Sequence, residues 1–127
     1  MDERHVASTG WWRGRLRSFG YAFRGLAICF RTQANARIHA LATALVVVLG
    51  FALKLVAWEW CAVVLSIASV WTAECFNTAM ESMVDLVSPE RQPLAGRIKD
   101  LAAGAVLAAA IGATAVGAII FLPKLLQ

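Results

Sequence analysis

The longest uninterrupted apolar stretch of this chain runs from residue 101 to residue 122, and all 22 residues in it are uncharged. Residues 40–56 form a second apolar stretch, interrupted only by Gly50 and Lys54, and residues 61–87 form a third. A helix needs about 20 apolar residues to cross the hydrocarbon core of a bilayer. We therefore predict an all-α membrane protein with three transmembrane helices, at about residues 40–56, 61–87 and 101–122.

The composition agrees with a membrane protein. Of the 127 residues, 60% are hydrophobic and 16% are charged, whereas soluble domains have about 45–50% apolar and about 25% charged residues. The length allows one integral membrane domain, residues 1–127. The basic N-terminus has no early apolar segment, so we expect no cleavable signal peptide. The three cysteines form no CxxC pair and lie among apolar residues, so we expect small buried or lipid-facing side chains and no disulfide framework.

Residues 11–37 carry two opposed rows of side chains, which predict an N-terminal amphipathic helix lying in the membrane interface. The basic row spans about 40° of one helix face, and the apolar row spans about 60° of the opposite face. The basic row is Arg13, Arg17, Arg24 and Arg31, and the apolar row is Phe19, Phe23, Leu26 and Phe30. Arginines on such a helix bind anionic lipid headgroups. We favour a simple lipid anchor; the alternative is that the arginines and Tyr21 also cover a phosphate site.

Three polar segments are expected to connect these helices. Residues 32–40 lead into the first span and place His39 at the membrane boundary, where a lone histidine is more often solvated than a ligand. Residues 57–60 (AWEW) are expected to form a tight turn at the outer interface. Residues 88–100 contain two prolines and should form a polar connector, because proline cannot continue the helical hydrogen-bond ladder.

The basic residues predict the orientation in the membrane. The N-terminal region carries seven arginines and the 88–100 connector three basic residues, whereas only Lys54 and Lys124 lie on the opposite side. Because basic loops stay in the cytoplasm, the N-terminus and the connector should be cytoplasmic. The C-terminus should then be periplasmic or extracellular. The expected location is a cytoplasmic (inner) membrane.

The middle span carries a row of polar side chains that a purely lipid-facing helix would not have. Glu74, Asn77, Glu81 and Asp85 are spaced by three, four and four residues, so they fall within about 80° of one helix face. One carboxylate at the centre of a bilayer costs about 2.5–3.5 kcal/mol. The row should therefore face protein or water, and we expect it to bind a metal ion or to take part in a reaction.

The residues around this row suggest phosphoryl transfer. Carboxylates suit Mg²⁺ held together with phosphates, and the nearby Lys99, with the arginines, suits phosphate. A deeper carboxylate, Glu74, suits a general base acting on a hydroxyl presented from within the bilayer. Neither a P-loop nor the protein-kinase motifs occur in the sequence. No nucleic-acid-binding motif occurs either, so no nucleic-acid partner is expected.

Four motifs then resemble those of the small prokaryotic diacylglycerol kinase and undecaprenol kinase family. The first is E-x-x-N-T-A-M-E-x-x-V-D at residues 74–85, and the second is Lys99-Asp100 followed by LAAGAVLAAA. The others are FGYAFRGL at residues 19–26 and ARIH at residues 36–39. The similarity covers roughly residues 18–124.

This resemblance implies a homotrimer of three-span subunits that uses Mg-ATP to phosphorylate a membrane lipid alcohol, either diacylglycerol or undecaprenol. It implies active sites shared between subunits, with Glu74 as general base and Glu81 as metal and nucleotide ligand. Asn77 and Asp85 would shape the site. The implied nucleotide contacts are Tyr21, Glu90, Lys99 and Asp100.

One position departs from the family pattern. Where the family usually has a second acidic metal ligand, in an E-x-N-x-R-I-H context, this chain has Gln33. Glutamine can ligate through its carbonyl oxygen but brings no charge. Either metal binding is weaker, a neighbouring acid substitutes, or activity is impaired, and we expect a higher Mg²⁺ requirement.

Two other functions fit parts of the sequence. A small oligomeric proton-coupled transporter would use Glu74 as its proton relay, but transporters of this kind usually have repeated halves, and the three spans here are dissimilar. A non-enzymatic adaptor that oligomerises through the third span would leave the row of carboxylates unexplained.

Overall fold

The chain folds into four helices. The computed structural model describes residues 3–90 and 92–126, with side chains from residue 11 onward. In order these helices are α1 (Glu3–Thr32), α2 (Ala34–Ala52), α3 (Ala57–Val87) and α4 (Pro93–Leu125). The all-α prediction is confirmed, and α2, α3 and α4 are each long and apolar enough to cross a membrane.

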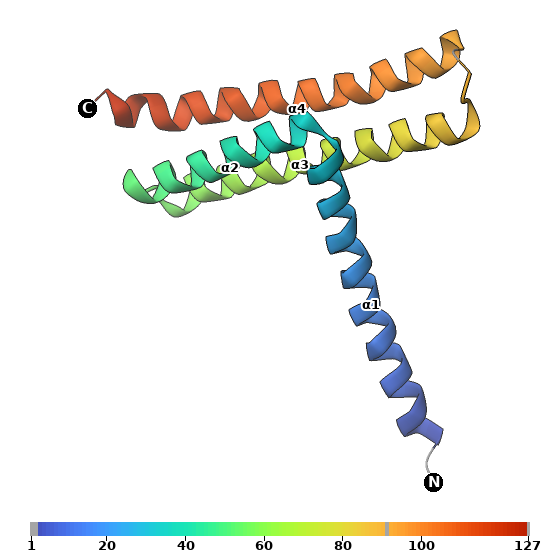
Figure 1. Ribbon diagram of the computed structural model, residues 1–127. Coiled ribbons are helices and arrows are strands. Elements are labelled where there is room, and N and C mark those ends of the chain that lie inside the picture. The colour runs from blue at the N-terminus through green and yellow to red at the C-terminus, as the bar shows by residue number, and fades with distance from the viewer. Residues whose placement is uncertain (1–2, 91, 127) are drawn as a thin grey trace.

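Helices α2, α3 and α4 lie side by side as a bundle, and α1 projects from it at a steep angle (Figure 1). The most extensive packing joins α3 and α4, which run antiparallel to each other (Figure 1). Helix α2 also packs on α3, but less extensively than α4 does. The end of α1 touches the bundle near the start of α2, and the remainder extends away from it.

The helix boundaries differ from those expected from the sequence. The expected surface helix over residues 11–37 ends at Thr32, because Gln33 adopts an extended backbone (φ −104°, ψ 123°) and α2 begins at Ala34. The polar residues that were expected to connect the two helices therefore form the first turns of α2. Proline fits the first turn of a helix, so α4 begins at Pro93 rather than at residue 101. It also continues past Pro123 to Leu125.

The expected turn at residues 57–60 is instead the first turn of α3. The Glu59 carboxylate accepts the backbone N–H of Val56 at 2.8 Å, which satisfies a donor at the helix start. It also pairs with the Lys124 ammonium at 3.1 Å. This ion pair fastens the beginning of α3 to the end of α4. Arg91, counted above among the basic residues of the connector, lies outside the described residues.

A small apolar core closes the same end of the bundle. Leu55, Val63, Ile120 and Phe121 are buried there, and Trp60 packs against them. The Trp60 ring lies over Gly50 of α2 so closely that a Cβ added to Gly50 would sit 2.7 Å from the ring. Gly50 thus allows α2 and α3 to approach each other at this level.

We expect Gly50→Ala to destabilise the protein by about 1–3 kcal/mol, because the Trp60 ring would have to move within a packed core. The measurement is the thermal unfolding midpoint in detergent. Gly96→Ala is the matched control, since no atom lies within 4 Å of the position of its added Cβ. An unchanged midpoint for Gly50→Ala would show that Trp60 moves without cost.

Candidate active site

Helix α3 points its polar residues into a cavity between α2, α3 and α4. The cavity has a volume of about 280 Å³. Its walls include Gln33, Asn35 and His39 from the α1–α2 corner, Glu74, Asn77 and Glu81 from α3, and Val106 and Ala110 from α4. Three of the four polar residues of the α3 row thus share one cavity, as the helical spacing predicted.

Glu74 is the most deeply placed of these residues, with only 1% of its surface exposed. Within the described residues, neither of its carboxylate oxygens has a hydrogen-bond partner, and the same is true of the Asn77 side-chain oxygen. Burying a polar group without a partner costs several kcal/mol, on the order of 2–7 for a neutral one and more for a charge. These three oxygens therefore have unused capacity to bind a hydrogen-bond donor or a cation.

Glu81 is held by two amide groups. The Gln33 Nε2 donates to its Oε2 at 2.9 Å, and the Asn77 Nδ2 donates to its Oε1 at 3.1 Å. The Gln33 side chain reaches Glu81 because the chain bends at Gln33 between α1 and α2. The structure thus brings together the two residues that the sequence assigned to a metal, although their direct contact is a hydrogen bond.

A divalent cation bound at Glu81 would find neutral amides next to it. No group of three histidine, cysteine, aspartate or glutamate side chains suited to a metal occurs among the described residues. Beside Glu81, the cavity offers the amide oxygens of Gln33 and Asn77 and, deeper, the Glu74 carboxylate. Within the described residues, Asn77 Oδ1 and both Glu74 oxygens lack a hydrogen-bond partner. Mg²⁺ is usually held by one or two carboxylates together with substrate phosphates. With Glu81 alone as the metal ligand, the residues fit Mg²⁺ with the smallest number of carboxylates that such sites usually have.

The fourth polar residue of the row, Asp85, lies outside the cavity. It forms an ion pair with the Lys99 ammonium at 2.5 Å, and both side chains are partly or largely exposed. This pair joins the end of α3 to the beginning of α4. Glu90 and Asp100 are exposed near the same end of the bundle.

Tyr21 is the one predicted nucleotide contact that the fold places far from the others. It lies on the projecting part of α1, is 63% exposed, and has the Arg24 guanidinium 5.7 Å from its ring centre. Twelve residues of chain, about 18 Å of helix, separate it from Gln33. Within one subunit, Tyr21 does not reach the cavity.

His39 is the wall residue that the sequence analysis missed. It was expected to be a solvated boundary residue, but it is half-buried and lines the cavity with Glu74. Asn35 and His39 are four residues apart, so they share a face of α2. The signal for this in the sequence was the spacing of these two polar residues, four apart in the first turns of an apolar helix.

The cysteines agree with the sequence analysis. All three are free, and Cys29 is buried with its Sγ 3.4 Å from the Thr78 hydroxyl, where α1 meets α3. Cys61 is exposed on α3.

Three helices long enough to cross a membrane, with carboxylates and amides facing a shared cavity, are typical of a membrane-embedded enzyme rather than of a passive anchor. Residues 20–121 match the family described as prokaryotic diacylglycerol kinase, so the chain belongs to that family. It is a membrane-bound lipid kinase.

Three relatives show the range of this family. The chain is 41% identical to the undecaprenol kinase of Bacillus subtilis over 109 residues, which cover 86% of this chain and 89% of that protein. It is 44% identical to a diacylglycerol kinase of Synechocystis over 111 residues, 87% of this chain but only 63% of that protein. It is 32% identical to the diacylglycerol kinase of Escherichia coli over 96 residues, 76% of this chain and 79% of that protein. The relatives are named for two different lipids, so family membership does not select the substrate.

Proposed function

We propose that this protein transfers the γ-phosphate of ATP to the hydroxyl group of a membrane lipid, with Mg²⁺, at the cytoplasmic face of the bacterial inner membrane. The lipid is diacylglycerol or undecaprenol. The observation that carries the proposal is the buried Glu74 carboxylate, whose two oxygens have no partner within the described residues. A carboxylate in that state is ready to accept a proton from an incoming hydroxyl group.

In the proposed reaction, Glu74 takes the proton of the lipid hydroxyl as its oxygen attacks the γ-phosphorus. The bond from that phosphorus to the β–γ bridging oxygen breaks, and ADP leaves. Catalysis of this kind depends mostly on positioning and on neutralising charge. The Asn77 oxygen, which faces the same cavity, can accept a hydrogen bond from a bound group and so helps to orient it.

The nucleotide is proposed to lie at the Asp85–Lys99 end of the bundle. Lysine binds phosphate as a point charge, and Lys99 can exchange Asp85 for a phosphate group because the pair is partly exposed. Glu90 and Asp100 are exposed near this end and are proposed to contact the nucleotide as well.

Mg²⁺ would be held by Glu81, with amide oxygens of Gln33 and Asn77 and the phosphates of ATP. When bound, it would neutralise the charge that develops on the phosphoryl group. Glutamine at position 33 already stabilises Glu81 by donating to it at 2.9 Å. The Gln33 amide would have to rotate to offer its oxygen to a metal, and losing its hydrogen bond to Glu81 would cost free energy. A carboxylate at position 33 would not have to rotate.

We therefore expect Gln33→Glu to lower the Mg²⁺ concentration needed for half-maximal activity by about tenfold, the scale on which groups around a metal change its affinity. The measurement is a Mg²⁺ titration at saturating ATP. Gln92→Glu, which changes an exposed glutamine just before α4, is the matched control. An unchanged Mg²⁺ dependence in Gln33→Glu would remove Gln33 from the metal site.

We also propose a homotrimer in which α1 lies in the membrane interface. The steep angle between α1 and the bundle fits a helix that lies flat while the bundle spans the membrane (Figure 1). Its aromatic residues Phe19 and Phe23 are exposed, as lipid contact requires. Because Tyr21 cannot reach the cavity of its own subunit, its proposed nucleotide contact would be made in a neighbouring site. Gly104 and Gly112 have no atom within 4 Å of an added Cβ, which leaves room for a neighbouring helix.

The orientation of the protein in the membrane is inferred from the distribution of its basic residues. The Asp85–Lys99 end and the basic α1 lie toward the same end of the bundle, and the positive-inside rule assigns them to the cytoplasm. ATP would then enter from the cytoplasm, and the C-terminus would be periplasmic or extracellular.

The experiment that tests this function offers radiolabelled ATP and high Mg²⁺ to the purified protein, with diacylglycerol and undecaprenol in parallel reactions. We expect label in one of the two lipids, and the labelled lipid identifies the substrate. The absence of label in both would overturn the proposed function. The transporter alternative is not favoured, because the chain belongs to a lipid kinase family.

A further inference from the structure

Two cysteines from different helices lie next to each other beside the candidate active site. Cys29 of α1 is 1% exposed, and its Sγ lies 3.4 Å from the Thr78 hydroxyl of α3. Cys75 precedes Thr78 by three residues, so the two share a face of α3. The Cys75 thiol accordingly has the Cys29 thiol as a hydrogen-bonding neighbour. Both cysteines are free, and we call them the thiol pair.

On α3, the thiol pair adjoins the proposed general base. Cys75 follows Glu74 directly in the chain. The Thr78 hydroxyl, which contacts Cys29, donates to the Glu74 backbone carbonyl at 2.9 Å. The Glu74 carboxylate itself has no hydrogen-bond partner within the described residues. Its position is therefore set by the α3 backbone, and a shift of this backbone moves the carboxylate.

On α1, the thiol pair adjoins the residue that holds Glu81. The Cys29 carbonyl accepts the backbone N–H of Gln33 at 3.0 Å, and the Gln33 Nε2 donates to Glu81 at 2.9 Å. Helix α1 contacts the bundle only near this end (Figure 1). A movement of Cys29 is therefore passed to the α1–α2 corner and from there to Glu81.

We propose that the thiol pair is a reversible oxidation site, at which an organic hydroperoxide converts Cys29 and Cys75 into a disulfide and thereby inactivates the enzyme. Cys75 belongs to a helix long and apolar enough to span the membrane, so an oxidant that dissolves in the bilayer reaches it more readily than a polar one. Formation of the disulfide depends only on the two thiols, whereas its effect on turnover rests on the proposed function.

The oxidation begins at Cys75, which is half-buried and hence the more accessible thiol of the pair. Its sulfur attacks the terminal oxygen of the hydroperoxide, the O–O bond breaks, and the alcohol leaves with the thiol proton, so that Cys75 becomes a sulfenic acid. The Cys29 sulfur then attacks the Cys75 sulfur, the S–O bond breaks, and water leaves with the Cys29 proton. Two thiols and one hydroperoxide thus give one disulfide, one alcohol and one water.

The disulfide changes the geometry of the active site because it draws α1 and α3 together. Its two sulfurs are about 2.05 Å apart, which is shorter than any contact between two free thiols. Cys29 must also leave the Thr78 hydroxyl to make this bond. A displacement of about 1 Å can cost about 10²-fold in rate. We therefore expect the oxidised enzyme to lose at least about tenfold of its turnover.

The proposal is tested by incubating the purified, intact protein with cumene hydroperoxide and then blocking the remaining thiols. We expect intact mass to show the loss of two hydrogens, and proteolysis to yield a peptide in which Cys29 is joined to Cys75. Turnover should fall with the same time course. A phosphine reductant should restore both the thiols and the turnover, which separates this change from methionine oxidation, because a sulfoxide needs its own reductase.

Cys75→Ser is the variant that removes the disulfide. We expect it to keep the turnover of the reduced wild type and to resist the hydroperoxide. Cys61→Ser is the matched control, since Cys61 is an exposed cysteine of the same helix, and it should be inactivated like the wild type. If Cys75→Ser lowers the turnover before oxidation, Cys29→Ser provides the same comparison from the other helix.

Three results would each overturn the oxidation site. They are a Cys29–Cys75 disulfide that leaves turnover unchanged, an inactivation that persists in both serine variants of the thiol pair, and a disulfide that joins two subunits instead. None of these results affects the kinase function. If the unoxidised wild type labels no lipid, the proposed function fails on its own, and the mass measurement still shows whether the disulfide forms.

Discussion

Replacing Glu74 with glutamine is expected to abolish measurable phosphate transfer while leaving a folded membrane protein. Glutamine has nearly the same shape, but its amide cannot take the proton of the lipid hydroxyl. The loss of a general base lowers rates by about 10²–10⁴-fold. Because the Glu74 oxygens have no partner within the described residues, the amide also relieves an unfavourable burial. The thermal unfolding midpoint should therefore stay the same or rise.

The matched control is Glu59→Gln, at the other end of the same helix. Glu59 is also buried, but its carboxylate has partners in the Lys124 ammonium and the Val56 N–H. We expect the opposite outcome, a lower unfolding midpoint and an unchanged turnover of the folded enzyme. Turnover is measured with radiolabelled ATP and the lipid that the wild type phosphorylates. Unchanged turnover in Glu74→Gln would rule out Glu74 as the base.

The sequence predicted those parts of the fold that depend on local chemistry. Long apolar runs are visible residue by residue, so the three membrane-spanning helices could be located. The row from Glu74 to Asp85 depends only on helical periodicity, and the structure places Glu74, Asn77 and Glu81 in one cavity as that periodicity predicted. Gln33 was singled out by comparison with a family motif, and the structure places its amide on Glu81.

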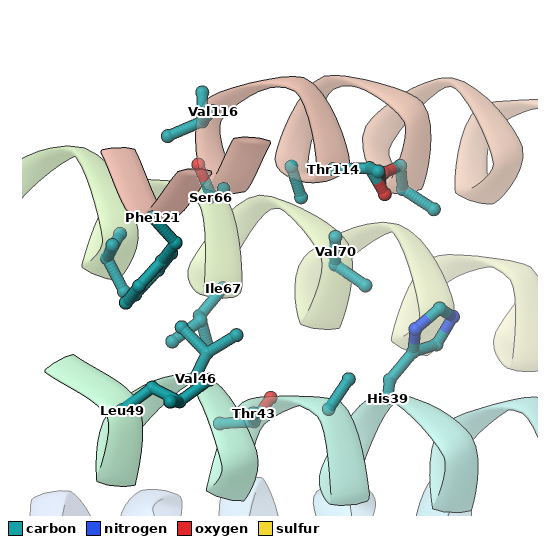
Figure 2. Close-up of a pocket in the computed structure, with 15 residues that line it drawn as sticks. His39, Thr43, Val46, Leu49, Ser66, Ile67, Val70, Thr114, Val116 and Phe121 are labelled. Carbon is teal, nitrogen blue, oxygen red and sulfur yellow. Dashed lines mark hydrogen bonds between the residues drawn. The ribbon is translucent and has the colours of Figure 1, made fainter. Parts of the chain in front are cut away.

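Other features depend on how the helices pack, which the sequence does not encode locally. The polar residues Asn35 and His39 suggested a connector, but they lie in α2 and line a cavity within the bundle. The direction of α1 depends on the backbone at Gln33, so the distance of Tyr21 from the cavity could not be foreseen. A second, apolar cavity between α2, α3 and α4 (Figure 2) likewise depends on the relative positions of three helices, and no sequence motif indicates it.

Replacing Glu81 with glutamine is the second change with a large expected effect. It removes the carboxylate to which the Gln33 and Asn77 amides donate, and an amide at that position cannot accept both of their hydrogen bonds as a carboxylate does. We expect kcat to fall by about 10²–10³-fold, the loss seen when a preorganised electrostatic group is removed. Unlike the loss in Glu74→Gln, it should be partly recovered at high Mg²⁺ or with Mn²⁺, because the missing group binds the cation rather than the proton.

The double variant Gln33→Glu/Glu81→Gln separates a role in metal binding from a role in folding. It keeps one carboxylate and one amide in contact but exchanges the two positions that carry them. If the pair holds the cation jointly, the double variant should regain at least about tenfold of the lost activity, giving a clearly non-additive double-mutant cycle. The Mg²⁺ titration should shift in the same direction. Strictly additive losses with an unchanged Mg²⁺ dependence would contradict a shared metal site and would leave Glu81 with a separate contact to the nucleotide.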